Sequence, residues 1–284
     1  GRFELNHFLD ALCRAGSVSI IYNQPIDSLA QVKDCDLLVG ADGANSFVRR
    51  ALEGEFQLKS EWLTNRFAWY GTAQMFDCLS LTFRANQVGH FVAHHYRHSQ
   101  SMSTFVVECD EATWRRAGLD RMTDEASRAY CEQVFARDLN GHPLVSNKSI
   151  WRQFPLLVTN RWSVDNAVLL GDAQRTVHFS IGSGTRLAFE DAIALDRAFA
   201  QAGDDVAGAL NLFERERRPI VEKILAAANA SSYWYERIAE KMKLEPWQLA
   251  YDYMTRSGRM TDARLRELSP KFMARVEKER SRIS

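Results

Sequence analysis

The stretch that decides the fold is residues 167–195, AVLLGDAQRTVHFSIGSGTRLAFEDAIAL. Its first four residues form a short apolar run, which is typical of a buried strand. A Gly-Asp pair at 171–172 ends that run, and the Gly-Ser-Gly segment 182–184 then opens a helical pattern of apolar residues. Unpaired N–H groups at a helix N-terminus attract negative charge, and glycine lets a flat ligand approach the backbone. The stretch therefore predicts a strand, an acidic turn and a glycine-rich loop at the start of a helix.

Composition limits the classes of function. A chain of 284 residues can bury a sizeable core, as one large domain or two close ones. Lysine plus arginine (36) equals aspartate plus glutamate (36), so no net field favours nucleic acid or an anionic membrane. No apolar run approaches the roughly 20 residues that span a bilayer. The 5 cysteines are scattered and odd in number, which favours free thiols in a reducing cytoplasm. Because the chain lacks an initial methionine, we expect that its start has been removed or lost.

The segments before residue 61 predict a helix and two strands. Residues 1–16 carry apolar side chains at helical spacing, residues 18–22 read as a short strand, and residues 36–40 read as a buried strand. The last of these delivers Asp42-Gly43 to its end. Ligands of open α/β sheets lie beyond the carboxyl ends of strands, a rule that this pair and the pair at 171–172 should both meet.

The middle and the end of the chain have different sequence patterns. Aromatic and β-prone segments predict an antiparallel sheet, followed by a helix and a further strand, at 67–76, 80–84, 89–97, 102–109, 124–139 and 150–154. After residue 195 the pattern is helical, with a boundary or kink expected at Pro219 and Pro270 expected at a helix start. The expected helices cover 206–218, 220–242, 246–256 and 261–282.

Two motifs together resemble those of the single-component FAD-dependent aromatic hydroxylases. The Gly-Asp pair at 171–172, the Gly-x-Gly at 182–184 and the segment 190–192 are similar to that family's second FAD-contacting motif. Residues 36–50, DLLVGADGANSFVRR, are similar to its Asp-Gly motif. The versions VHFSIGSG at 177–184 and YDYMTRSGR at 251–259 most resemble a subgroup that acts on salicylyl-CoA and anthraniloyl-CoA and on a tryptophan-derived substrate of violacein biosynthesis.

The resemblance implies an α/β fold, built as an incomplete FAD-binding Rossmann-like domain with an inserted antiparallel β-sheet substrate domain and a helical C-terminus. The expected FAD-binding domain comprises 1–60 and 158–200, the substrate domain 61–157, and the C-terminal helical region 201–284. No G-x-G-x-x-G motif follows a strand, so we expect the family's first βαβ unit to be missing, through truncation or loss. Weak FAD binding by this chain alone and an exposed sheet edge should result.

The resemblance also implies the reaction. We expect a cytoplasmic flavin-dependent monooxygenase that uses FAD, NAD(P)H and O₂ to hydroxylate an aromatic ring, of an aryl-CoA thioester such as salicylyl-CoA or anthraniloyl-CoA. A tryptophan-type hydroxylase of a pigment pathway and a truncated, non-catalytic flavoprotein fragment are the alternatives. The expected partner is a small aromatic substrate, not nucleic acid or a membrane, and a homodimer or missing terminal domains are left open.

The cofactor contacts that the resemblance implies are concentrated in the two motifs. Reduced flavin carries negative charge at N1, which N–H donors at a helix start would stabilise. The aspartates would hydrogen-bond the sugar-like chain or shape the nicotinamide approach, although each could instead cap a helix or close a turn. The candidate cofactor-binding residues are Arg2, Asp42, Gly43, Gly171, Asp172, Gly182, Ser183, Gly184 and Thr185.

His178 is the candidate catalytic residue, because an imidazole before the flavin-facing loop could hydrogen-bond substrate or flavin. The candidate substrate contacts are Tyr70, His94 and Phe179, whose alternative is packing in a core. Four histidines lie between 90 and 98, but a strand there turns 94 and 95 to opposite faces, so no metal site is expected. An i,i+4 ion pair is expected between Arg186 and Glu190. Arg175 stands where the resembled family usually has histidine, so the geometry of this loop is left open.

Overall fold

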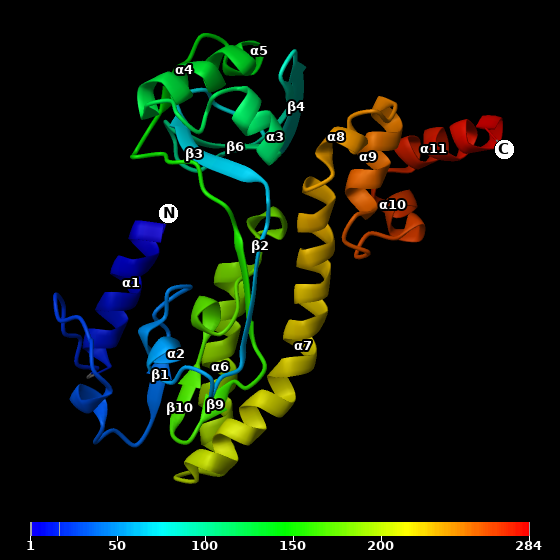
Figure 1. Ribbon diagram of the computed structural model, residues 1–284. Coiled ribbons are helices and arrows are strands. Elements are labelled where there is room, and N and C mark those ends of the chain that lie inside the picture. The colour runs from blue at the N-terminus through cyan, green and yellow to red at the C-terminus, as the bar shows by residue number, and fades with distance from the viewer. Residues whose placement is uncertain (1, 17, 284) are drawn as a thin grey trace. The chain divides into compact units, whose positions relative to one another are not determined.

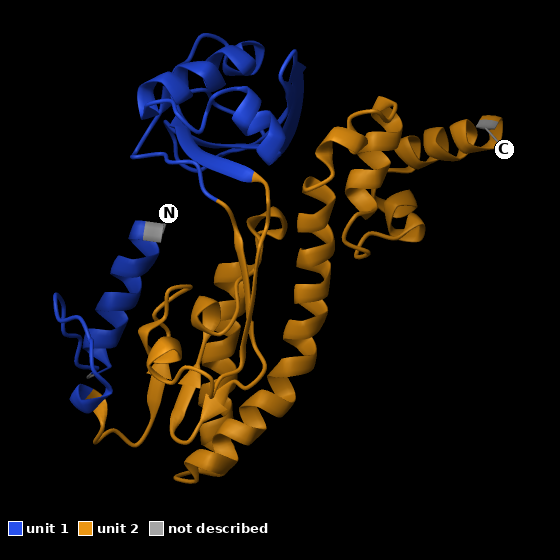
Figure 2. Cartoon of the chain, viewed as in Figure 1, with its two compact units in different colours: residues 1–31, 66–152 blue, residues 32–65, 153–284 orange. Residues whose placement is uncertain are grey.

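The structure is a computed structural model that describes residues 2–16 and 18–283, with only the backbone described at 2 and 283. The chain forms two compact units (Figure 2). Unit 1 comprises residues up to 31 together with 66–152, and unit 2 comprises 32–65 and 153 onwards. The finer division at residues 60, 157 and 200 stays a prediction.

The sheet of unit 2 begins from the two predicted buried strands. β1 (Leu38–Gly40) pairs in parallel with β10 (Ala167–Leu169), and β10 pairs antiparallel with β9 (Ser163–Val164). In this order β1 is the outer strand. A Cβ on Gly40 would lie 2.7 Å from the Leu169 side chain and 3.0 Å from Val48 Cβ, so these two side chains leave little room for a larger residue there.

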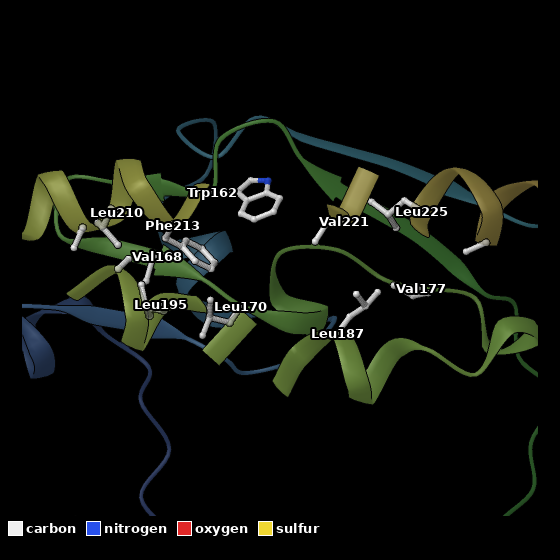
Figure 3. Packing of buried hydrophobic residues seen from close by; sticks show 13 residues of the cluster. Trp162, Val168, Leu170, Val177, Leu187, Leu195, Leu210, Phe213, Val221 and Leu225 are labelled. Carbon is white, nitrogen blue, oxygen red and sulfur yellow. The ribbon is translucent and has the colours of Figure 1, made fainter. Parts of the chain in front are cut away.

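Two long helices cover this sheet. α6 (Gly184–Ala202) packs against α7 (Val206–Tyr235), and α6 buries side chains at spacings of three and four residues, as an amphipathic helix does. Figure 3 shows the resulting core, in which Leu187 from α6 lies with Val221 and Leu225 from α7. Of the two alternatives predicted at Pro219, a boundary or a kink, the boundary is wrong, because α7 continues through the proline. Buried side chains on both sides of the proline hold the helix together, and Figure 1 shows that α7 is bent.

The rest of unit 2 consists of a strand ribbon and shorter helices. β2 (Leu58–Trp62) pairs antiparallel with β8 (Pro155–Thr159), so the strand predicted at 150–154 lies further along the chain. The predicted helix 261–282 is interrupted at Ser269, and Pro270 begins its second part as expected. The remaining elements of unit 2 are α2 (Phe47–Ala51), η2 (Gly171–Ala173), η3 (Phe179–Ile181), α8 (Ile238–Lys241), α9 (Pro246–Thr255), α10 (Asp262–Leu268) and α11 (Pro270–Ile283), and η1 (Leu29–Val32) spans the boundary between the units.

Unit 1 contains the predicted antiparallel sheet, with strand order β4-β5-β6-β3-β7. Its strands are β3 (Arg66–Thr72), β4 (Ser80–Asn86), β5 (Gly89–Arg97), β6 (Ser103–Cys109) and β7 (Leu144–Val145). A hydrophobic core joins one face of this sheet to the helical segments, which are α3 (Glu111–Arg116), α4 (Asp124–Val134) and α5 (Ala136–Leu139). The predicted helix 124–139 is divided at Phe135, a buried residue of that core.

The N-terminal segment of unit 1 confirms one prediction and corrects another. α1 (Arg2–Ala15) is the expected helix. The strand predicted at 18–22 is wrong, since those described residues lie outside any strand and expose Val18, Ile21 and Tyr22. An apolar run without a neighbouring strand to pair with gains little from an extended conformation.

The chain passes from unit 2 into the sheet and back through two adjacent segments. The amide of Leu63 donates to the carbonyl of Phe154 at 3.0 Å, and Gln153 Nε2 donates to the carbonyl of Leu63 at 3.0 Å. The Glu236 carboxylate at the end of α7 accepts from the amides of Thr64 and Asn65 at 2.7 and 2.9 Å. Together these bonds fix the chain segment at residues 63–65.

The mixed α/β architecture, with its antiparallel sheet and helical C-terminus, is confirmed. Among the described residues, we find no helix with both the length and the apolar character needed to cross a membrane.

Candidate functional site

The two sequence motifs leave the same end of two neighbouring strands. β1 and β10 run in parallel with Gly40 opposite Leu169, and the amide of Leu170 donates to the carbonyl of Gly40 at 3.0 Å. The Asp42 and Asp172 loops therefore both begin beyond the carboxyl ends of these strands, as predicted from their positions. Both aspartates are exposed.

Asp42 organises its own loop. Its carboxylate accepts hydrogen bonds from the amides of Phe47 and Val48 at 2.6 and 3.2 Å, which caps the start of α2. Ser46 adds a second cap by accepting from the Arg49 amide at 3.0 Å. Gly43 has φ of +80°, a conformation that favours glycine. The loop is thus held open by local bonds, and its predicted contact with a cofactor stays a prediction.

Arg49 joins the two motif loops, a role that the sequence analysis missed. Its buried guanidinium donates to the carbonyl of Ala44 in the first loop and to that of Ala173 in the second. Burial lowers the pKa of Arg49, and the nearby Asp42 carboxylate opposes that shift. The sequence signal was only its place within the Asp-Gly motif, because a contact across more than a hundred residues has no spacing pattern.

Gly171 is required by both conformation and packing. It has φ of +57°, and a Cβ placed on it would lie 3.1 Å from Ala188 Cβ on α6. Its amide donates to the Asp191 carboxylate at 3.2 Å. The turn after β10 is therefore fixed to the helix that begins at the glycine loop.

A buried ion-pair network lies beneath that turn. Asp191 is fully buried between the Arg175 and Arg217 guanidinium groups, at 2.7 and 2.9 Å. Burial lowers the pKa of Arg175, and Asp191 opposes the shift. Arg175, which left the loop geometry open in the sequence, therefore anchors the turn. Glu190 pairs with Arg217 at 2.9 Å and, as predicted, with Arg186 at 2.8 Å.

The glycine loop leaves the start of α6 open. The Ser183 hydroxyl donates to the Ile181 carbonyl at 3.2 Å, and this N-cap residue makes no side-chain capping bond within the described structure. Gly182 has φ of +61°. Apart from chain neighbours, no heavy atom of the described residues lies within 4 Å of a Cβ built on Gly182 or on Gly184. This open cradle of first-turn amides, with Thr185 exposed beside it, suits an anionic, flat group.

His178 lies directly before this loop and is buried. Its Nδ1 accepts from the Ser180 amide at 3.3 Å, and its ring stacks on Phe179 with centroids 4.3 Å apart. Phe154 approaches the same imidazole at 4.8 Å between centroids. One ring nitrogen thus stabilises the turn η3, while the predicted catalytic role of His178 stays a prediction.

The candidate substrate residues of unit 1 lie on opposite faces of the sheet. In the strand register Tyr70 is opposite Phe105 and His94 is opposite Val106, so alternation separates them. Tyr70 is buried in the core on the helix side, where burial raises its pKa. The hydroxyl of Tyr70 faces Ser127 Oγ of α4 at 3.4 Å, and its substrate contact stays a prediction.

His94 lies on the other face, with its Nε2 3.6 Å from a carboxylate oxygen of the buried Glu108. Its neighbour His95 points into the core and hydrogen-bonds Thr82 at 2.9 Å, as the strand alternation predicts. Among the described residues, no three His, Cys, Asp or Glu side chains are grouped so that they could hold a metal ion. The side chain of Arg2 lies outside the described residues, so its flavin contact stays a prediction.

The fold and the site define a class. A parallel strand pair whose carboxyl ends carry two polar loops, one of which meets an open helix N-terminus, is typical of α/β proteins that bind nucleotide-type cofactors. Residues 18–228 match the model of the FAD binding domain family, so the chain belongs to that family. The resemblance recognised in the two motifs is confirmed, and FAD is the cofactor of the family.

Curated relatives and a solved structure agree. The chain is 39% identical over 266 residues to salicyloyl-CoA 5-hydroxylase of Streptomyces sp., which covers 90% of this chain and 52% of that protein. It is 36% identical over 272 residues to protodeoxyviolaceinate monooxygenase of Chromobacterium violaceum, covering 95% and 70%. The crystal structure of pqsL, a probable FAD-dependent monooxygenase from Pseudomonas aeruginosa, has a TM-score of 0.54 at 25% identity, covering 71% and 56%. The chain thus spans about half the length of the first of these relatives.

Proposed function

We propose that this chain forms the flavin- and substrate-contacting part of an FAD-dependent monooxygenase that hydroxylates the aromatic ring of an aryl-CoA thioester. The observation that carries the proposal is the open N-terminus of α6, a helix that is bonded to the Asp172 turn beside the Asp42 loop. The 39% identity to salicyloyl-CoA 5-hydroxylase supports the aryl-CoA class. NAD(P)H and O₂ are the proposed co-substrates.

The residues of unit 2 fit FAD. The amides of residues 182–185 would hold the electron-rich edge of the ring system, because the glycines leave room for close approach and the helix start favours negative charge. The exposed carboxylate of Asp172 would accept hydrogen bonds from the ribityl hydroxyls. The Asp42-Gly43 loop would contact the same cofactor and shape the nicotinamide approach. When bound, FAD accepts a hydride and activates O₂, so the protein need only supply position, charge and exclusion of water.

In unit 2 the proposed substrate contact is Phe179, with His178 as a hydrogen-bonding partner, and in unit 1 it is His94. The buried Glu108 beside His94 can hold the imidazole in one orientation. The imidazole could then hydrogen-bond a phenolic or thioester oxygen of the substrate.

A colour and titration experiment tests the cofactor step. We expect the purified chain to bind added FAD, with quenching of flavin fluorescence and a perturbed visible absorbance band. A chain that remains colourless and leaves the fluorescence of FAD unchanged would contradict the proposal for the chain alone. That result would favour the alternative of a non-catalytic fragment.

Substrate-stimulated oxidation of NADH and NADPH tests the substrate class. We expect salicyloyl-CoA or anthraniloyl-CoA to accelerate oxidation and to yield a hydroxylated aryl-CoA, with the free acids as matched controls. A hydroxylase of a pigment pathway is the second candidate, because the violacein-pathway relative covers 95% of this chain. If tryptophan or an indolic pigment precursor stimulates oxidation and neither aryl-CoA does, the second candidate replaces the first.

A further inference from the structure

A C-terminal arginine reaches back to the turn that precedes the glycine loop. Arg256, directly after α9, donates from Nη2 to the Ser180 carbonyl in η3 at 3.2 Å. Its Nε donates to the Ser231 hydroxyl on α7 at 2.8 Å. Its Nη1 donates to the carbonyl of Tyr253 at 2.7 Å. One guanidinium therefore links η3, α7 and α9.

Aromatic rings fix the orientation of that guanidinium. Its central carbon lies 3.8 Å from the centroid of the Tyr253 ring and 5.9 Å from that of Tyr235. Close stacking over a tyrosine face stabilises a cation and holds the planar fork toward its acceptors. Lysine at this position would keep the charge but could not satisfy three acceptors with one fixed plane.

The same turn has a second attachment. The hydroxyl of Ser180 lies 2.8 Å from that of Ser231, which is fully buried, and Ser231 also receives the Arg256 bond. The Ser180 amide donates to His178, and Gly182 follows two residues later. The backbone on both sides of Ser180 thus belongs to the candidate site, while its carbonyl and hydroxyl are held from α7 and α9.

We propose that Arg256 is a positioning residue, which fixes η3 and so aims the amides of residues 182–185 before any cofactor arrives. The inference rests on the proposed function, since it assigns those amides to the flavin. A loop that is ordered in advance binds more tightly, because the ligand does not have to supply the free energy of ordering it. The C-terminal helices would then serve the cofactor site without contacting the cofactor.

Hydrogen–deuterium exchange of the cofactor-free chain tests the positioning directly. We compare the wild type with R256A, R256K and S231A, and with R266A as control, since Arg266 makes an exposed ion pair with Glu277 in the same helical region. R256A should raise exchange in peptides spanning 178–186 by about tenfold, and S231A should raise it less. R256K should recover less than half of the lost protection. Peptides of β6 and of α11 should match the wild type in every variant.

FAD fluorescence titration then connects the loop to the cofactor. R256A should raise the apparent Kd for FAD by about tenfold, whereas R266A should leave it unchanged. Unchanged exchange at 178–186 in both R256A and S231A would overturn the proposal, as would an increase spread evenly over all peptides. Faster exchange at 178–186 in R256A, together with an FAD affinity equal to that of the wild type, would also overturn the proposal. If the wild type binds no FAD, the proposed function fails, while the exchange data still decide whether Arg256 orders the loop.

Discussion

At the scale of single residues, the site depends on side chains that are absent as much as on those present. Gly182 and Gly184 leave open space above the first turn of α6, whereas Gly171 is packed against Ala188 and Gly40 against Leu169. The first pair is therefore available to a ligand, and the second pair serves the fold. Substitutions at the two kinds of glycine should have different consequences.

Gly184→Val should separate binding from folding. Apart from chain neighbours and the helix's own backbone, no described atom lies within 4 Å of a Cβ built there, so the free energy of unfolding should change by less than about 1 kcal/mol. The side chain fills the cradle, so the Kd for FAD should rise at least about tenfold, or about 1.4 kcal/mol. Ala192→Val, on the exposed side of the same helix, is the control for helix propensity. Equal FAD affinity in both variants would contradict the assignment.

Asp191→Asn should destabilise the whole unit. The variant leaves Arg175 and Arg217 buried without their shared carboxylate, a change that typically costs about 3–5 kcal/mol. Urea denaturation followed by tryptophan fluorescence measures the loss. Arg186→Ala removes only an exposed pair and should cost less than about 1 kcal/mol. A small loss for Asp191→Asn would mean that the network contributes little.

At the scale of elements, the sequence was most informative where a strand is followed by a polar loop. The apolar runs before Asp42 and Asp172 predicted β1 and β10, and the glycine loop predicted the start of α6. The same apolar signal failed at 18–22, because strand formation needs a partner that composition does not reveal. Tyr70 shows a second limit: aromatic residues occur on both faces of a sheet, and only the register separates a core residue from a surface one.

Contacts between distant elements were the least predictable part of the site. Arg49 reaches Ala173, Arg217 reaches Asp191, and Arg256 reaches Ser180, each across an interval without periodicity. Their sequence environments resemble those of any surface arginine on a helix. Only the folded chain shows that these cations hold the loops of the site.

Protonation of His95 should lower the free energy of unfolding of unit 1 as the pH falls. Burial lowers the pKa of His95 to about 4, below its value of 6.5 in an unfolded chain. The unfolded state therefore binds more protons in that interval, so the contribution of His95 to stability is full above pH 6.5 and falls as the pH drops toward 4.

Urea unfolding of the wild type and of His95→Gln across this interval measures the effect. Glutamine keeps a polar partner for Thr82 but does not titrate. The difference in unfolding free energy between the two proteins should shrink by about 1–2 kcal/mol from pH 7 to pH 4. A constant difference would show that His95 titrates normally in the folded sheet.

At the scale of the whole molecule, the chain passes between the two units three times, after residues 31, 65 and 152. The Glu236 carboxylate receives the amides of Thr64 and Asn65 directly before the chain enters the sheet. The crossing after residue 65 is thus fixed by a side chain at the end of α7 rather than by sheet pairing alone.

Glu236→Ala should loosen this crossing. The loss of hydrogen bonds to a charged acceptor should lower the free energy of unfolding by about 1–2 kcal/mol. Limited trypsin digestion should cut faster after Arg66, which follows the released segment. Glu240→Ala, which removes only an exposed pair with Arg237, is the control. Identical cleavage rates in both variants would show that Glu236 does not hold the segment at residues 63–65.

The hydrogen bond between Leu63 and Phe154 has an evolutionary consequence. The two ends of the inserted segment 66–152 leave unit 2 at neighbouring points. The segment could therefore be exchanged without changing the path of the chain in unit 2. A short loop could close the gap, and another sheet could be grafted there. Under the proposed function, a change of substrate would then require changes in one exchangeable piece of the chain.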